Sequence, residues 1–191
     1  MDASDASPGD GGGMDGGGGD AGPSFGVPSV VGAYGCFVQS GDGGDLLDDG
    51  RSAPTLTSSP YGAPCGASSW VSDNQFAHAP MTPPTVISMR RSFILQQAVA
   101  AGDVTLSVKA DDAAEIVVNG QLVGGCTPPG GSPGACQAGC QVVTFPGTVL
   151  RPQGQLNTVE VRLVNLQSNA IGSGNYGYTA ISYTICVNAP E

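Results

Sequence analysis

Apolar and polar residues alternate with a period of two along much of the chain after residue 85. In Val104–Ala110, apolar residues take every second position, with Thr105, Ser107 and Lys109 between them. This is the pattern of a strand that buries one face and exposes the other. Related patterns predict five further strands, at Val30–Gln39, Val86–Leu95, Gln141–Phe145, Thr158–Asn165 and Tyr178–Val187.

The strongest local signal is a β-hairpin in Glu115–Val123, where Asn119-Gly120 separates two β-branched runs. A two-residue type I′ turn needs positive φ at both central positions, which Asn and Gly adopt most easily. Short strands joined by Gly- and Pro-rich turns predict two packed antiparallel sheets. We therefore expect an all-β protein, with an antiparallel β-sandwich in residues 26–191 and no second domain.

Residues 1–25 have a different composition. They contain five Asp, no basic residue and almost no side chain large enough to bury. Such a segment cannot offset the entropy of ordering itself, so we expect a disordered acidic Gly/Asp-rich tether. Calcium binding or partner recognition by this segment are the alternatives. It resembles the spacer that follows the lipid-modified cysteine of bacterial surface lipoproteins, although that cysteine is absent here.

The charge balance excludes one class of partner. The formal net charge is -10, and no basic stripe interrupts the acidic surface. Because such a surface repels phosphate backbones, nucleic-acid binding is not expected. No apolar run approaches the roughly 18 residues of a membrane span. The N-terminus also lacks the basic and apolar regions of a signal peptide, so we expect any export signal to lie outside this sequence.

The six cysteines favour disulfides formed in a secreted or cell-surface protein. Zinc sites and free thiols are the alternatives, but the closest pair, Cys136 and Cys140, lacks zinc-knuckle spacing. Fifteen pairings are open. Cys36–Cys186 is favoured, because first and last strands are often neighbours in sandwiches. The irregular segment 124–140 has three cysteines, so at least one must reach Cys36, Cys65 or Cys186 if all six are paired. The six are Cys36, Cys65, Cys126, Cys136, Cys140 and Cys186.

Several short motifs follow one another in a distinctive order: Ala67–Val71 with its Trp, Met89–Phe93, Val104–Val123, Gly154–Val159, Asn165 and Gly177. This order resembles the galactose-binding-like jelly-roll domains of bacterial secreted or surface proteins. The likeness runs from residue 65 to residue 187 and implies the same fold. Segment 124–140 departs from the family pattern and puts an inherited ligand in doubt.

No catalytic constellation stands out, so we do not expect an enzyme. The single histidine, His78, lies in a Pro-rich stretch, and no G-x-S-x-G motif is present. Asp111 and Asp112 are adjacent and are interpreted as turn-capping residues rather than a carboxylate pair for glycoside hydrolysis.

No cofactor is predicted. Calcium is the one metal that the sequence could accommodate, because oxygen atoms from flexible loops are its usual ligands. The acidic segment 40–50 gathers four carboxylates that offer such oxygens, although their spacing is not that of an EF-hand. A solvated acidic loop is the alternative. The four are Asp42, Asp45, Asp48 and Asp49.

Carbohydrate binding needs an aromatic face for the apolar side of a sugar ring and planar polar groups for its hydroxyls. Five residues are candidates, and the alternative is that they pack in the core or in ordinary strands. They are Trp70, Asn165, Asn175, Tyr176 and Tyr178.

Two functions remain open. The first is a non-catalytic recognition module that binds a glycan or cell-surface polymer. The second is a structural or assembly subunit that self-associates, for example through an open sheet edge.

Overall fold

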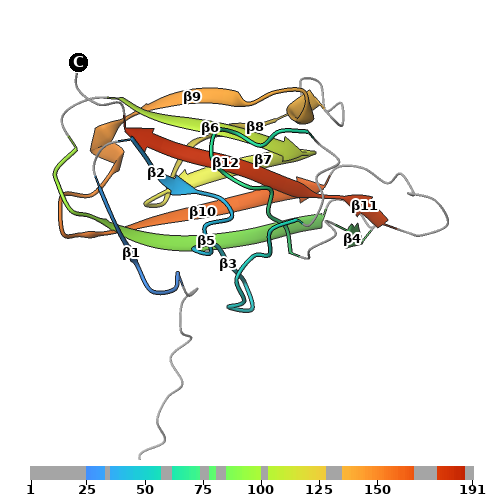
Figure 1. Cartoon of the computed structure of the whole chain (residues 1–191), viewed down its shortest axis with the longest axis horizontal. Coiled ribbons are helices and arrows are strands. Elements are labelled where there is room, and N and C mark those ends of the chain that lie inside the picture. Colours follow the sequence, from blue (N-terminus) through green and yellow to red (C-terminus); the bar gives the residue numbers. More distant parts are fainter. Residues whose placement is uncertain are drawn as a thin grey trace, which may run out of the picture.

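The protein is an all-β sandwich of jelly-roll type, shown here by a computed structural model (Figure 1). The structure describes residues 25–32, 35–56, 62–73, 78–80, 85–99, 103–127, 135–165 and 176–187. Helix within these ranges is limited to two 3-10 turns, η2 (Ala135–Gln137) and η3 (Gly147–Val149). The strands are β1 (Ser29–Val31), β2 (Gly35–Gln39), β3 (Leu46–Leu47), β4 (His78–Pro80), β5 (Thr85–Leu95), β6 (Asp103–Asp111), β7 (Ala113–Val118), β8 (Gln121–Cys126), β9 (Gln141–Pro146), β10 (Leu156–Asn165), β11 (Tyr176–Tyr178) and β12 (Ala180–Val187).

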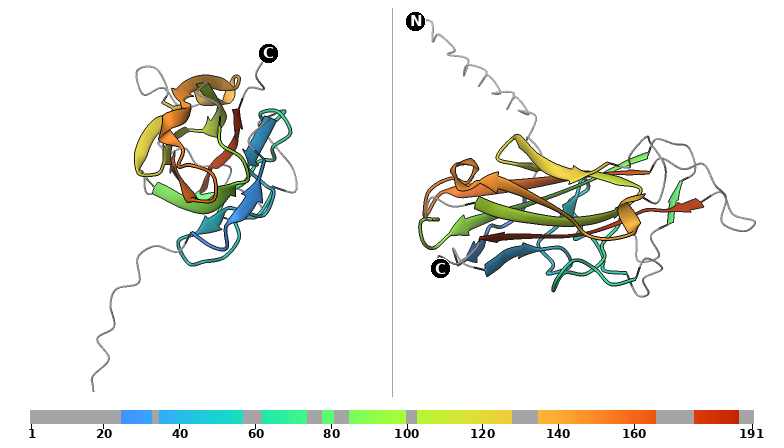
Figure 2. Two further views of the ribbon diagram at one scale, coloured as in Figure 1. Left: turned by 90° about the vertical axis from the view of Figure 1, so that its left-hand side faces the viewer. Right: turned by 90° about the horizontal axis from the view of Figure 1, so that it is seen from above.

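Two sheets face each other across one core. The first sheet has the order β1-β5-β10-β7-β8, with β3 also pairing with β5; the second has the order β2-β12-β6-β9. The chain crosses from the first sheet to the second between β5 and β6 and returns at β7, and seen end-on the layers nearly close into a barrel (Figure 2). Among the strands that the structure describes, all pairings are antiparallel except β1 with β5. The predicted antiparallel sandwich of jelly-roll type is confirmed.

The alternating sequence explains which faces meet. In β10, Val159, Val161 and Leu163 are buried, whereas the intervening Glu160 and Arg162 face outward. In β5 the inward positions hold Ile87, Met89, Phe93 and Leu95, and a fifth inward position holds a charged residue, Arg91. Apolar burial of this kind is the main stabilising contribution to such a fold.

The predicted hairpin is confirmed. Asn119 and Gly120 join β7 to β8 with φ values of 50° and 81°, as a type I′ turn requires. The Asn119 side chain also donates hydrogen bonds to the Val149 carbonyl at 2.9 Å and to Asn157 Oδ1 at 2.8 Å. This asparagine therefore fixes both the turn and the adjoining loop that precedes β10.

The single strand predicted for Val30–Gln39 is wrong in its extent. Two strands occur there: β1 pairs with β5 in the first sheet, and β2 pairs with β12 in the second. The chain changes sheets between them, and Gly35 at the start of β2 has a φ of 71°, which glycine adopts easily. Local alternation does not reveal such a change of pairing partner.

All six cysteines form disulfides. The expected Cys36–Cys186 pair is confirmed and joins β2 to β12. The pairs Cys65–Cys140 and Cys126–Cys136 complete the set. Segment 124–140 is thus tied to Cys65 outside it, as the cysteine count requires.

Segment 62–73, which contains no long strand, covers part of the outer face of the second sheet. Its backbone at Val71 pairs with Ile181, which continues the edge of that sheet beyond β2. The Cys65 N–H donates to Ser182 Oγ at 2.7 Å, and Ser68 Oγ lies 2.7 Å from the same atom. These contacts place Trp70 beside β12.

Candidate functional site

One end of the sandwich brings together segments that are far apart in the sequence. Asn165 at the end of β10 pairs with Thr85 at the start of β5, and Asp111 at the end of β6 pairs with Ala180 at the start of β12. The small ribbon of β4 and β11 lies at the same end (Figure 1). We call this the β4–β11 end.

Trp70 lies at this end but is buried, with only 3% of its surface exposed. It packs against Ala180 and Leu56, and its indole N–H donates to the Gly62 carbonyl at 3.0 Å. The Lys109 ammonium lies 5.6 Å from the ring centroid, within cation–π range. The ring is therefore occupied by the protein itself, which favours the packing alternative; its role in ligand binding stays a prediction.

The other predicted contact residues lie at or near the same end. Asn165 is fully buried at the end of β10. Tyr176 and Tyr178 lie in β11, where they pair with Pro80 and His78 of β4. Asn175 falls outside the described residues. The fold thus gathers four of the five predicted residues at one end, and ligand contact by any of them remains to be tested.

The acidic segment is neutralised by arginines. Asp42 and Asp45 lie against Arg91; in addition, Asp48 pairs with Arg90, and Asp49 pairs with Arg51 at 2.7 Å. No group of three or more His, Cys, Asp or Glu side chains in the described ranges could hold a metal ion. These pairings use the carboxylates that calcium would need.

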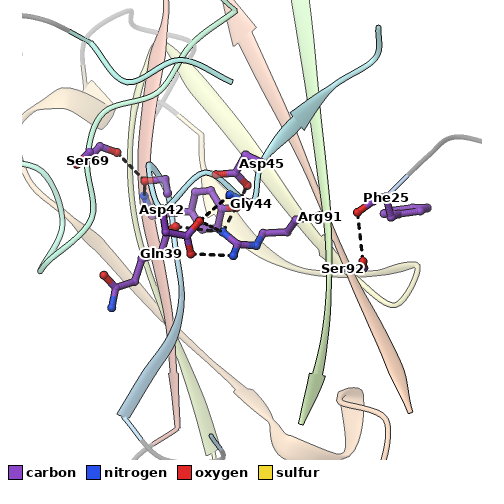
Figure 3. A network of polar contacts seen from close by, with 10 residues as sticks. Phe25, Gln39, Asp42, Gly44, Asp45, Ser69, Arg91 and Ser92 are labelled. Atoms are coloured by element: carbon purple, nitrogen blue, oxygen red, sulfur yellow. Dashed lines mark hydrogen bonds and ion pairs between the residues drawn. The ribbon is translucent and has the colours of Figure 1, made fainter. Parts of the chain in front are cut away.

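Arg91 forms the centre of a buried polar cluster (Figure 3). Its two terminal nitrogens donate to the two Asp42 carboxylate oxygens at 2.9 and 2.8 Å, and one of them also donates to the Gln39 carbonyl at 3.0 Å. Asp45 lies 3.8 Å from the same guanidinium and accepts a hydrogen bond from the Tyr183 hydroxyl. The cluster fastens the β2–β3 loop over the edge between the two sheets.

Burial dominates the electrostatics of this cluster. Desolvation raises the pKa of Asp45 to about 6, although Arg91 and the Tyr183 hydroxyl act in the opposite direction. Desolvation also raises the pKa of Tyr183 well above its usual value, and the charge of Asp45 adds to this effect. The Tyr183 hydroxyl therefore stays neutral and acts as a donor.

A hollow of about 240 Å³ opens beside the β4–β11 end, between the β3 loop and the first half of β5. It combines charged and apolar groups: three carboxylates, one guanidinium, a hydroxyl and Val86, whose surface is 55% exposed. Sequence reasoning missed this hollow, because its lining comes from segments far apart in the chain that β3–β5 pairing and the Arg90–Asp48 ion pair bring together. Its lining is Leu47, Asp48, Asp49, Arg51, Asp73, Val86, Ile87 and Ser88.

The adjacent Asp111 and Asp112 have a structural environment. Both are buried, and the Asp111 carboxylate accepts a hydrogen bond from the Gln137 side chain of η2. The Asp112 N–H donates to the Val164 carbonyl at 3.3 Å. These residues connect β6 to the Cys-rich segment and to β10, in line with a structural rather than a catalytic role.

None of the helices within the described ranges is long and apolar enough to cross a membrane.

No protein-family model matches the sequence. No curated protein matches it either.

Several solved structures are similar to parts of the chain. A Streptomyces avermitilis α-L-rhamnosidase complexed with L-rhamnose matches 75% of this chain and 12% of its own, with 17% identity and a TM-score of 0.45. A Pleurotus ostreatus lectin matches 71% of this chain and 31% of its own, with 22% identity and a TM-score of 0.39. The Clostridium stercorarium carbohydrate-binding module CsCBM6-3, in complex with cellobiose, matches 86% of this chain and all (100%) of its own, with 13% identity and a TM-score of 0.38.

The chain thus spans less than a third of the rhamnosidase and of the lectin. At TM-scores below 0.5, these similarities assign neither a family nor a ligand to this chain.

Proposed function

We propose that the protein is a non-catalytic recognition module of the secreted or cell-surface space that binds a glycan at the β4–β11 end. The observation that carries this proposal is the convergence of strands bearing the sequence-predicted contact residues beside an open hollow of mixed polar and apolar lining. Three disulfides support an oxidising compartment.

The lining of the hollow suits a sugar chemically. Carboxylates and guanidinium groups offer paired acceptors and donors that match vicinal hydroxyls. The exposed Val86 side chain supplies an apolar contact for the C–H side of a ring. At about 240 Å³ the hollow is smaller than the roughly 300–1,000 Å³ of pockets that enclose a drug-sized ligand. It fits one unit of a longer polymer rather than an enclosed small molecule.

The same lining argues against glycoside hydrolysis. A general acid needs a carboxyl group whose pKa is raised, so that it carries a proton at neutral pH. Hydrogen bonds from the Arg51 backbone N–H and guanidinium instead lower the pKa of Asp49. Asp48 is engaged by Arg90. Asp49 is therefore suited to accept hydrogen bonds and not to donate a proton.

The test is a glycan array with the oxidised protein, followed by calorimetry on any ligand found. Val86→Glu should weaken binding at least tenfold, because it places a fourth carboxylate in the hollow. Val30→Glu is the matched control: Val30 is 62% exposed and lies at the other end of the same sheet. Silence across the array, or equal loss in both variants, would overturn the proposal.

The alternative function is a structural or assembly subunit. One observation favours it: Val27 and Val30, which follow the Gly/Asp-rich residues 1–25, are 93% and 62% exposed. Exposed apolar residues beside a sheet edge are typical of surfaces that associate with other proteins.

A further inference from the structure

Strand β9 forms one border of the second sheet (Figure 1), and β6 is its pairing partner in the described structure. Its sequence, Gln-Val-Val-Thr-Phe-Pro, contains no charged residue. Val142 is 65% exposed, and Thr144 is exposed as well. A strand edge with unpaired backbone groups, β-branched residues and no charge is open to pairing with another chain.

The other sheet borders are less suited to pairing. In β8, Gly125 approaches β7 so closely that a Cβ atom would lie 2.1 Å from the Ala114 carbonyl oxygen, and the β7–β8 register shifts beside Val117. The β2–β12 pairing shifts register next to the Cys36–Cys186 disulfide. β1 and β3 have three and two residues. Irregular or short edges are the usual protection against unwanted pairing, and β9 has none of these features.

Strand β8 lies close to β9 but forms no ladder with it in the described structure. Gly124 of β8 lies against the Val143 side chain of β9: a Cβ atom added at Gly124 would lie 3.0 Å from that side chain. Among the described strands β9 forms a ladder with β6 alone, so its other backbone edge has no ladder partner there.

We propose that β9 is a self-association surface at which two copies of this protein pair antiparallel about a two-fold axis. An antiparallel pair of identical strands is self-complementary, as a two-fold interface requires. A register centred on Val143 places Val142 of one copy opposite Thr144 of the other. The two four-stranded sheets would then form one continuous sheet of eight strands.

The charge distribution of the protein identifies a second copy of this chain as the partner that pairs with β9. The chain carries -10 overall, so most of its surface repels another copy, but β9 brings no like charges together. A basic partner protein would instead choose a border with carboxylates. Because the long-range repulsion between two copies is screened by salt, association through β9 should strengthen as ionic strength rises.

The test combines size and exchange measurements on the full oxidised chain. Sedimentation across a concentration series should show a monomer–dimer equilibrium that shifts toward dimer with added sodium chloride. Val142→Lys places two like charges beside the axis and should weaken dimerisation at least tenfold. Leu122→Lys on β8 is the matched control, since Leu122 is 60% exposed, and it should leave the dimerisation constant unchanged.

Hydrogen exchange separates this dimer from any other. Amide protection in residues 141–145 should increase with protein concentration in the wild type and stay constant in Val142→Lys. A protein that is monomeric at its solubility limit in high salt overturns the proposal. So does a dimer whose β9 amides exchange equally at low and high concentration. Neither outcome bears on glycan binding, on which this proposal does not rest.

Discussion

Arg91 of β5 and Asp42 of the β2–β3 loop form a two-pronged ion pair, with both nitrogen–oxygen distances below 3 Å at 2.9 and 2.8 Å. The two residues are 49 positions apart, and Arg91 is 1% exposed in a row of otherwise apolar inward residues. The guanidinium therefore holds a loop against the sandwich from inside the core. Asp42 is 41% exposed, so Arg91 is the desolvated partner of this pair, and the buried Asp45 carboxylate depends on the same guanidinium.

Replacing Arg91 by Ala should lower the free energy of unfolding by about 3–5 kcal/mol, the usual cost of removing one member of a buried pair. The loss leaves the buried Asp45 carboxylate without its nearby cation. Chemical denaturation followed by circular dichroism measures the change.

Arg90→Ala is the matched control for this experiment. Arg90 is the next residue along β5 and pairs with Asp48, whose side chain is 62% exposed. Because Arg90 is 17% exposed but its partner Asp48 stays solvated, this variant should lose about 1 kcal/mol, less than Arg91→Ala. Equal losses in the two variants would contradict the buried-pair account.

Acidification from pH 6 toward pH 4 should stabilise the protein through Asp45. The pKa of this carboxyl is about 6 in the folded chain, above its usual 3.8 in the unfolded chain. Between these values the folded state binds a proton that the unfolded state does not, so the free energy of unfolding rises as pH falls. The contribution is fully present below pH 3.8 and is lost as pH rises through 6. Its size is on the order of 2–3 kcal/mol.

Asp45→Asn tests this directly. The variant keeps an acceptor for the Tyr183 hydroxyl and carries no titrating group. The difference in unfolding free energy between wild type and variant should change between pH 6.5 and 4.5. A difference that stays constant across this range would rule out Asp45 as the titrating group.

The strand pattern and one turn were predictable because they depend on neighbouring residues. Alternation in β6 and β10 and the Asn119-Gly120 turn are local properties, and the structure confirms them. The separation of β1 from β2 was missed because it depends on which distant strand each one pairs with.

The polar cluster could not be derived from sequence for the same reason. Asp42 and Asp45 look like parts of a solvated acidic loop until β5 brings Arg91 next to them. An arginine at an inward position of an alternating strand was the one available signal, since a buried guanidinium needs a carboxylate partner. By residue type Trp70 is likewise a candidate for contact with a sugar ring, but it is buried by tertiary packing that a local sequence pattern does not show.

Removing the Cys65–Cys140 disulfide should destabilise the protein more than removing Cys126–Cys136. The first closes a loop of 75 residues and the second a loop of 10. Loop-closure entropy predicts losses of roughly 4.5 and roughly 2.7 kcal/mol. Paired Cys→Ala variants compared by thermal melting measure both. A larger loss for the short loop would show that packing around Cys126, and not chain entropy, sets the cost.

Trp70→Phe separates the two roles considered for this residue. Phenylalanine keeps an aromatic ring but removes the N–H that donates to the Gly62 carbonyl. It also weakens the cation–π contact with Lys109. We expect a loss of about 1–2 kcal/mol of unfolding free energy, from one hydrogen bond and some packing volume. Affinity for any glycan identified on the array should stay within about twofold, because a ring that is 3% exposed has no face free for a sugar. Unchanged stability together with a large loss of affinity would instead show that Trp70 contacts the ligand, through a conformation in which its ring is exposed.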